Sequence, residues 1–222
     1  MAKNFAVVLC GSGRSDGSEI TEAVSTLVHL SRLGLTYRCF APDAPQTEIV
    51  NHATGKLMPG NQSRNMMVES ARISRGEISP ITSLLAADFD AVVFPGGNGL
   101  AKNLCDFASK GAECVVMPDV ERVIREFHAA KKGIGLICIA PVLAARVLGA
   151  RMNGPGCKVT IGSDAGAAGK IAEMGSTNVP KGVGEAYLDE KNRVYSTPAY
   201  MYDAKPHEVF EGIGRMIEMM AR

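Results

Sequence analysis

Short apolar segments that alternate with helical segments are the feature that most limits how this chain can fold. The apolar segment 5–10 is followed by residues 18–33, where apolar side chains recur at helical spacing, and then by a strand-like segment at 36–40. Asp16 is expected to cap the helix, with Glu19 as its capping-box partner. A strand, a helix and a strand in this order predict a parallel pair with a right-handed crossover.

The same alternation continues to the end of the chain. Further strands are predicted at 90–94, 135–138, 158–161 and 193–196, and further helices at 63–75, 119–131, 140–148 and 206–221. This pattern is typical of an α/β fold in three layers. Segment 42–62 is rich in Pro, Asn and Gly and is predicted to be irregular. Because no repeat or internal boundary divides the chain, we predict one domain over residues 1–222.

Charge and length exclude several functional classes. The 222 residues carry a net charge of +1, from 24 basic and 23 acidic side chains, so no long-range attraction to nucleic acid or an anionic membrane is expected. No apolar run approaches the roughly 20 residues that span a bilayer. The chain runs from its first four residues directly into an apolar strand, without an Arg-rich leader or a signal peptide, and we therefore expect a cytoplasmic protein.

Cysteine and histidine spacing gives no metal-binding pattern. The closest two of the six cysteines are nine residues apart, and the four histidines form no H-x-x-x-H. We expect six free thiols and no metal. The cysteines are Cys10, Cys39, Cys105, Cys114, Cys138 and Cys157.

Cys138 stands between a predicted strand and a predicted helix with no loop to spare. Such a turn pushes its central side chain out over the end of the sheet, as in a nucleophile elbow, although the G-x-S-x-G motif is absent. A thiol at a helix N-terminus is expected to have a lowered pKa. The alternative is a buried structural cysteine at a strand end.

The glycine-rich segment 95–99 follows another buried strand. Consecutive glycines let backbone N–H groups approach an anion, so Gly96 and Gly97 are candidates for substrate binding. The N–H groups of Gly97 and Ile139 would form an oxyanion hole. The alternative is an ordinary turn between a strand and a helix.

Two carboxylates in the first turns of helix 18–33 are candidate acid–base groups. Glu19 and Glu22 are three residues apart and lie on one helical face, so either could contact a thiol at the end of the sheet. The alternative is that both complement the helix dipole. His52 is the best candidate for a site histidine. The segment Gly11–Gly17 departs from the dinucleotide-binding pattern because position 16 is Asp.

Several motifs occur in a fixed order along nearly the whole chain. They include Asp16-Gly17-Ser18-Glu19-Ile20, Phe40-Ala41-Pro42-Asp43, Ser63-Arg64-Asn65, Phe94-Pro95-Gly96-Gly97, Ala101-Lys102-Asn103-Leu104, Cys138-Ile139-Ala140-Pro141 and Thr197-Pro198-Ala199-Tyr200-Met201. In this combination the chain resembles the ElbB family within the PfpI-like, class I glutamine amidotransferase-like superfamily. The resemblance implies a flavodoxin-like three-layer sandwich with a mostly parallel sheet.

The resemblance also implies the arrangement of the site. Cys138 would lie on the elbow, a glutamate of the first helix would lie beside its thiol, and Gly97 would carry an oxyanion N–H. The spacing to Gly34 favours Glu22 for this glutamate. It further implies a homodimer, a glutathione-independent glyoxalase activity and, for bacterial members, a link to isoprenoid biosynthesis.

The sequence departs from the amidotransferase and peptidase patterns. No late histidine suits a triad, because His207 opens the last helix, and Ile139 stands where peptidase-type relatives have histidine after the cysteine. Both departures argue against glutaminase and protease activity. A carboxylate would then have to move the protons.

We therefore predict an enzyme without cofactors whose partners are small reactive aldehydes. The Cys138 thiolate would attack glyoxal or methylglyoxal, and Glu22, with Glu19, would move a proton between the two carbons to give glycolate or lactate. The alternative is a non-enzymatic redox-sensing or stress-binding protein in which Cys138 is oxidised.

Overall fold

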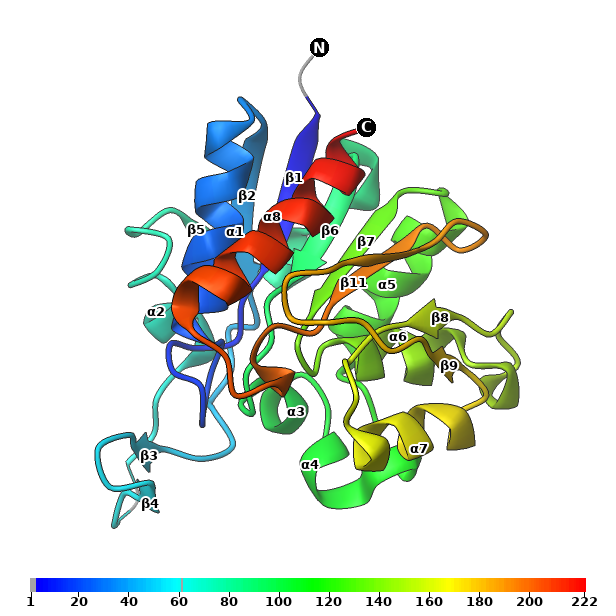
Figure 1. Cartoon of the computed structure of the whole chain (residues 1–222). Coiled ribbons are helices and arrows are strands. Elements are labelled where there is room, and N and C mark those ends of the chain that lie inside the picture. The colour runs from blue at the N-terminus through cyan, green and yellow to red at the C-terminus, as the bar shows by residue number, and fades with distance from the viewer. Residues whose placement is uncertain (1–2, 61) are drawn as a thin grey trace.

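Seven strands form the central sheet of the computed structural model, which describes residues 3–60 and 62–222 (Figure 1). Residues 1, 2 and 61, which belong to the expected N-terminal start and to segment 42–62, lie outside the described residues. The strands are β1 (Asn4–Val8), β2 (Thr36–Ala41), β5 (Ile78–Pro80), β6 (Ala91–Phe94), β7 (Gly133–Ile137), β10 (Tyr187–Asp189) and β11 (Val194–Thr197). Neighbouring strands are parallel except β10 and β11, which confirms the predicted α/β fold with a mostly parallel sheet.

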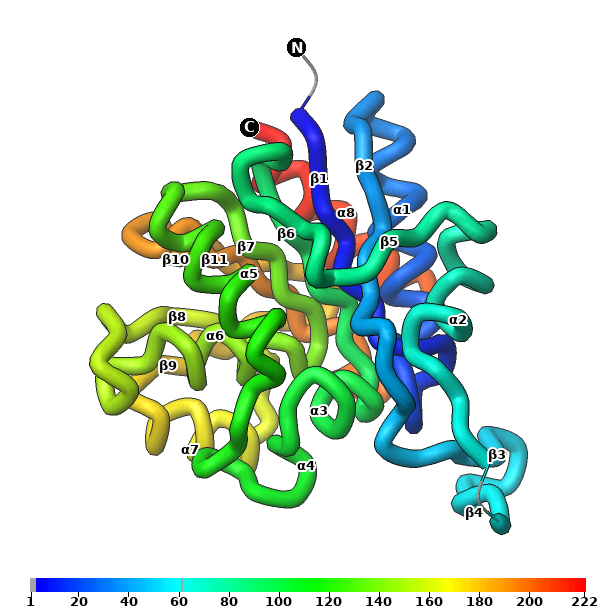
Figure 2. The backbone as a smooth tube through the Cα atoms, turned by 180° about the vertical axis from the view of Figure 1, so that it is seen from behind, coloured from blue at the N-terminus to red at the C-terminus, as the bar shows by residue number. Residues whose placement is uncertain are grey.

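The order of the strands reverses between β1 and β6. The sheet reads β10-β11-β7-β6-β1-β2-β5, so the chain first builds outward from β1 to β5 and then in the other direction from β6 to β10. At such a reversal the loops after the two neighbouring strands diverge and leave a crevice at their carboxyl ends. Strand β1 begins, and the last helix of the chain ends, at the opposite end of the sheet (Figures 1 and 2).

Helices cover both faces of the sheet and make the three layers. Helices α1 (Ile20–Arg32) and α8 (Pro206–Ala221) pack together on one face (Figure 1), and α5 (Pro118–Ala129) and α6 (Pro141–Leu148) cover the other (Figure 2). The remaining helices are α2 (Met66–Ser70), α3 (Leu100–Asn103), α4 (Phe107–Lys110) and α7 (Ala165–Glu173).

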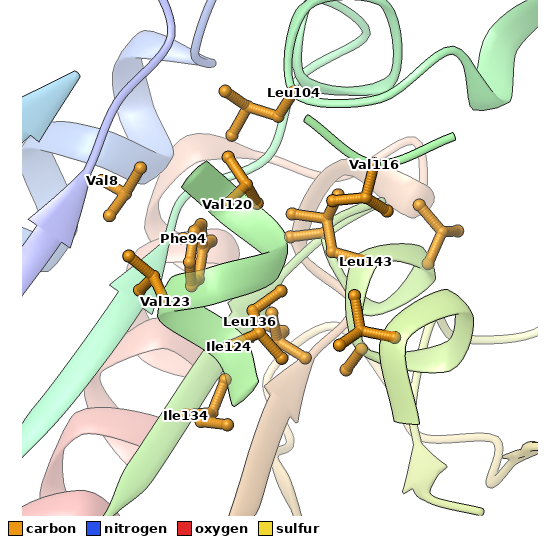
Figure 3. Packing of buried hydrophobic residues seen from close by; sticks show 14 of the residues in the cluster. Val8, Phe94, Leu104, Val116, Val120, Val123, Ile124, Ile134, Leu136 and Leu143 are labelled. Carbon is orange, nitrogen blue, oxygen red and sulfur yellow. The ribbon is translucent and has the colours of Figure 1, made fainter. Parts of the chain in front are cut away.

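The hydrophobic core is divided by the sheet into two clusters. On the α5 side, Phe94 and Leu136 of the sheet pack against Val123 and Ile124 (Figure 3). The cluster on the other side contains Phe5, Val7, Leu30, Val93, Ile213 and Ile217. Because both faces of the inner strands are buried, these strands are apolar at nearly every position, which is why the sequence reveals them.

The first helix begins later than expected. It starts at Ile20 rather than residue 18, and its cap is Glu19, whose Oε2 accepts a hydrogen bond from the Glu22 N–H at 2.8 Å. The expectation that Asp16 caps this helix is therefore wrong. Asp16 is buried, and its Oδ2 instead accepts a hydrogen bond from the Val50 N–H at 2.8 Å.

Three peripheral segments also differ from their predictions. The helix expected at 63–75 is confined to α2, and hydrogen-bonded turns follow it. The strand expected at 158–161 is β8 (Lys158–Val159), which pairs with β9 (Thr177–Asn178) outside the central sheet. Segment 42–62 contains a short hairpin of β3 (Val50–Asn51) and β4 (Lys56–Leu57), which projects from the body of the molecule (Figures 1 and 2).

Candidate active site

Cys138 lies on a tight turn between β7 and α6. Its φ is 60°, in the left-handed region that side chains other than glycine rarely adopt. The Cys138 N–H donates a hydrogen bond to the Thr197 carbonyl oxygen at 2.9 Å, which fixes the turn to the end of β11. Residues with a strained backbone are concentrated at functional sites. Here the strained turn places the Cys138 thiol at the end of the sheet, where the residue is 7% exposed.

The glycine loop after β6 packs directly against this turn. A Cβ atom on Gly96 would lie 2.7 Å from the Cβ of Cys138 and 2.6 Å from the Ile137 carbonyl oxygen, so a side chain cannot fit there. Gly97 has a φ of 105°. The N–H groups of Gly97 and Ile139 lie near enough to the sulfur of Cys138 to lower the pKa of the thiol against the effect of burial. The structure therefore brings the two expected N–H donors to one atom.

Glu22 is completely buried beside the thiol. The Gly96 N–H donates a hydrogen bond to its Oε2 at 2.8 Å, whereas its Oε1 is buried and has no hydrogen-bond partner among the described residues. Burial raises the pKa of Glu22 to about 8, and the charge of Glu19 adds to the rise. Contacts with the Gly96 and Tyr200 N–H groups and the Cys138 thiol act in the opposite direction. At neutral pH the carboxyl group is therefore largely protonated.

The pKa of Cys138 moves against the prediction. Burial raises it well above its ordinary value, and the neighbouring Glu22 carboxylate adds to the rise. The N–H groups of Gly97 and Ile139 lower it, but they do not outweigh burial. The expectation of a lowered thiol pKa is wrong, because the thiol is removed from water. Of the neighbouring pair Glu22 and Cys138, Glu22 has the lower pKa, about 8, and is therefore the first to lose its proton.

Glu19 occupies a different place from Glu22. Its carboxylate caps α1, and its N–H donates a hydrogen bond to the Gly96 carbonyl oxygen at 2.9 Å. Its side chain lines a pocket over Cys138, and burial raises the pKa of its carboxyl group. Glu19 thus joins α1 to the glycine loop, while Glu22 contacts the thiol.

A pocket of about 560 Å³ opens over Cys138. Its walls come from the loops after β1 and β6, from the elbow and from the segment after β11. The lining residues are Arg14, Glu19, Gly97, Asn98, Cys138, Tyr200, Met201, Tyr202, Asp203 and Ala204. The sequence reasoning missed Arg14, although its place in the glycine-rich loop after the first strand is a usable signal.

The structure does not bring His52 into this pocket. Its Nε2 accepts a hydrogen bond from the Ser15 N–H at 3.2 Å, and its Nδ1 lies 3.1 Å from the Val50 carbonyl oxygen. His52 therefore ties the projecting hairpin to the loop after β1. Among the described residues that line the pocket, none is a histidine.

Nowhere in residues 3–60 and 62–222 do three His, Cys, Asp or Glu side chains gather as ligands for a metal ion. Among the helices of the same ranges, none has the length and apolar character needed to cross a bilayer.

Comparisons with known proteins give close relatives. No protein-family model matches the chain. It is 47% identical to the ES1 protein homolog, mitochondrial, of Rattus norvegicus, over 96% of the chain and 81% of that protein. It is also 47% identical to the human glutamine amidotransferase-like class 1 domain-containing protein 3, mitochondrial, over 97% of the chain and 81% of that protein. These relatives are named mitochondrial, so the expectation of a cytoplasmic protein is wrong.

A solved structure matches over the whole fold. It is an isoprenoid biosynthesis protein with an amidotransferase-like domain from Ehrlichia chaffeensis, with a TM-score of 0.91, 37% identity, and coverage of 99% of this chain and 98% of that chain. The homodimer, the single domain, the aldehyde partners and the roles of the site residues stay predictions.

Proposed function

The chain belongs to the ElbB family within the PfpI-like, class I glutamine amidotransferase-like superfamily, and we propose that it is a glyoxalase that needs no cofactor. It converts glyoxal or methylglyoxal to glycolate or lactate. Cys138 is the nucleophile, Glu22 is the acid–base group, and the N–H groups of Gly97 and Ile139 hold the oxyanion.

One observation carries this proposal: the buried Oε1 of Glu22, beside the thiol, has no hydrogen-bond partner among the described residues. A buried oxygen without a partner costs about 1–3 kcal/mol, so its presence in a packed site calls for an explanation. The hydroxyl of a carbonyl adduct on Cys138 would supply the missing donor.

The first step is addition of sulfur to the aldehyde. In the reactive form the pair holds one proton, and Glu22 accepts that proton from the thiol as sulfur bonds to the aldehyde carbon. The electrons of the C=O bond move to oxygen, which the N–H groups of Gly97 and Ile139 stabilise. The oxygen then takes the proton from Glu22, and the product is a hemithioacetal.

The second step moves hydrogen between the two carbons. Glu22 removes the proton from the carbon bonded to sulfur, and an enediolate forms. Glu22 then returns that proton to the neighbouring carbon, while the proton of the hemithioacetal hydroxyl moves to the oxygen of the neighbouring carbon. The result is a 2-hydroxyacyl thioester on Cys138. Water then attacks the acyl carbon, the C–S bond breaks, and the thiol is regenerated. One carbon is oxidised and its neighbour is reduced, so no external oxidant or reductant is needed.

Burial of the thiol favours this reaction over the redox-sensing alternative. Peroxide-sensing cysteines are exposed and have a low pKa. Cys138 is 7% exposed, and burial raises its pKa. A thiol of this kind gains its nucleophilic form through transfer of its proton to a neighbouring base, and Glu22 is in contact with it.

The test uses purified protein with glyoxal or methylglyoxal, without glutathione or added metal, and follows the hydroxy acid by NMR. Wild type is expected to form product, and Cys138→Ala none. Glu22→Gln is expected to lose about 100-fold or more in kcat, the usual contribution of a general base. Cys39→Ala, which removes a buried thiol far along the sheet, is the matched control and is expected to retain activity.

Two results would contradict the proposal. Product from Cys138→Ala at the wild-type rate would exclude a thioester. Absence of product from wild type, combined with peroxide oxidation of Cys138 in preference to Cys39, would support the redox alternative.

A further inference from the structure

Arg14 brings a cationic side chain to the pocket over Cys138. Of the described residues that line it, Arg14 alone is Lys or Arg. Its side chain is exposed. Among the described residues, the guanidinium takes part in no ion pair. We propose that Arg14 selects the substrate, and that the preferred substrate is a 2-oxoaldehyde with a carboxylate at the end remote from the aldehyde. This inference rests on the proposed function.

The backbone of Arg14 is fixed relative to the oxyanion donors. The Asn98 N–H donates a hydrogen bond to the Arg14 carbonyl oxygen at 2.6 Å, and Asn98 follows Gly97 directly. On the other side, the Gly13 N–H donates to the Ser18 carbonyl oxygen at 2.9 Å. Arg14 therefore stands on a hydrogen-bonded turn attached to the loop that contacts the sulfur. A cation held in this way can bind a remote group while the aldehyde lies on Cys138.

The acidic groups of the pocket limit where an anion can lie. Glu19 already accepts the hydrogen bond that caps α1, and Arg14 lowers its pKa against the effect of burial. Asp203 is exposed and also lines the pocket, so it repels an anion. A ligand with a single carboxylate, placed at Arg14 and neutral elsewhere, fits this distribution of charge.

The size of the pocket supports a longer substrate. Its volume of about 560 Å³ falls in the range of sites that enclose drug-sized ligands. Glyoxal and methylglyoxal fill only a small part of such a space. A five-carbon chain leaves the dicarbonyl end free for Cys138 and Glu22 and extends the other end toward Arg14.

A substrate of this kind would react through the same steps as methylglyoxal, with the same bonds formed and broken. With 4,5-dioxopentanoate, sulfur adds to the aldehyde carbon, the proton of that carbon moves to the ketone carbon, and water releases 2-hydroxypentanedioate. The remote carboxylate takes no part in bond making or breaking. Its contribution is binding energy alone, which makes it a clean probe of selectivity.

The experiment compares 4,5-dioxopentanoate with its methyl ester, which has the same dicarbonyl end and no charge. Arg14→Ala is expected to lower kcat/KM for the carboxylate by about 10- to 100-fold, the usual effect of losing a charged hydrogen bond, and for the ester by less than about 2-fold. Asp203→Asn is expected to raise kcat/KM for the carboxylate. Arg151→Ala removes an exposed arginine outside the pocket and is expected to change neither substrate.

The failure of this inference can be told from that of the proposed function. An equal loss on carboxylate and ester in Arg14→Ala would overturn selection by Arg14, since a misplaced loop affects both. If wild type turns over neither compound, the glyoxalase proposal fails. An NMR titration with 2-hydroxypentanedioate then tests separately whether Arg14 forms an anion site. Binding by wild type that weakens in Arg14→Ala supports the anion site, and equal or absent binding refutes it.

Discussion

At the scale of single residues, Glu19 and Glu22 are one helical turn apart, yet their carboxyl groups lie in different environments. Glu19 is the cap of α1, so its side chain folds back onto the Glu22 N–H at 2.8 Å. Glu22 lies inside the helix and projects into the sheet end, where it is fully buried. The sequence places both in the first turns of one helix and cannot separate them. The position of the helix cap determines which of the two glutamates is buried, and the backbone angles determine which residue is the cap.

The charge of Glu19 raises the pKa of Glu22, and its removal is therefore expected to lower that pKa. In Glu19→Gln the amide oxygen can still cap α1. With Glu22 as the proposed base, the rising limb of kcat/KM against pH is expected near pH 8 for wild type and at a pH lower by roughly one unit or less for the variant. Initial rates from about pH 6 to about pH 9.5 measure the limb. Glu173→Gln, which removes an exposed charge on α7, serves as the control. A limb that stays in place in Glu19→Gln would refute the coupling between Glu19 and Glu22.

At the scale of elements, the site is a junction of a helix start, a glycine loop and an elbow. The Glu19 N–H of α1 bonds to the Gly96 carbonyl oxygen, and the Gly96 N–H bonds to Glu22. A Cβ on Gly96 would meet the Cys138 Cβ at 2.7 Å and the Glu22 Oε2 at 2.9 Å. The φ of Gly96 is not positive, so a left-handed backbone is not the reason for glycine at this position. Glycine is required because the neighbouring groups approach too closely for a side chain.

Gly96→Ala is expected to abolish detectable turnover and to destabilise the protein by about 1–3 kcal/mol, since the new methyl group must push the elbow and α1 apart. Gly169→Ala, in the interior of α7 where a Cβ meets nothing within 4 Å, is the same substitution in open space. It is expected to keep activity and to stabilise by up to about 1 kcal/mol. Denaturant unfolding and the methylglyoxal assay measure both variants. Full activity in Gly96→Ala would contradict the close approach.

How much of this could be foreseen depends on whether the deciding contacts are local. The inner strands and the elbow were predictable, because continuous apolar runs and a strand followed at once by a helix are local patterns. The cap of α1 was not, because the Asp16 carboxylate is used by the Val50 N–H, which is remote in sequence. The thiol pKa was misjudged because burial depends on the packed environment. Arg14 joins the site only through the alignment of two loops.

At the scale of the whole molecule, the buried carboxyl group links stability to pH. The pKa of Glu22 is raised from its ordinary 4.5 to about 8, so the folded chain holds this proton more tightly than the unfolded chain. Its contribution to the free energy of unfolding is fully present below pH 4.5 and is lost as the pH rises through about 8. Under the proposed mechanism, the chain would reach its reactive protonation state over the same pH range in which it gives up this contribution.

Glu22→Gln cannot titrate, so its stability should depend less on pH than that of wild type. Between about pH 5.5 and about pH 8.5, wild-type Tm is expected to fall by several degrees more than the Tm of the variant. Thermal unfolding followed by circular dichroism measures both proteins in matched buffers. Parallel Tm curves for the two proteins would show that Glu22 does not carry the linkage.

The two outer strands of the sheet have a consequence for self-association. Strand β5 at one edge and β10 at the other are three residues long, and β5 ends in Pro80, which has no N–H to donate. An exposed strand edge is a template on which other chains can add strands, and natural sheets oppose this with short edges and proline. These two outermost strands offer a neighbouring chain few unpaired groups, so growth into aggregates by strand addition to β5 or β10 is opposed.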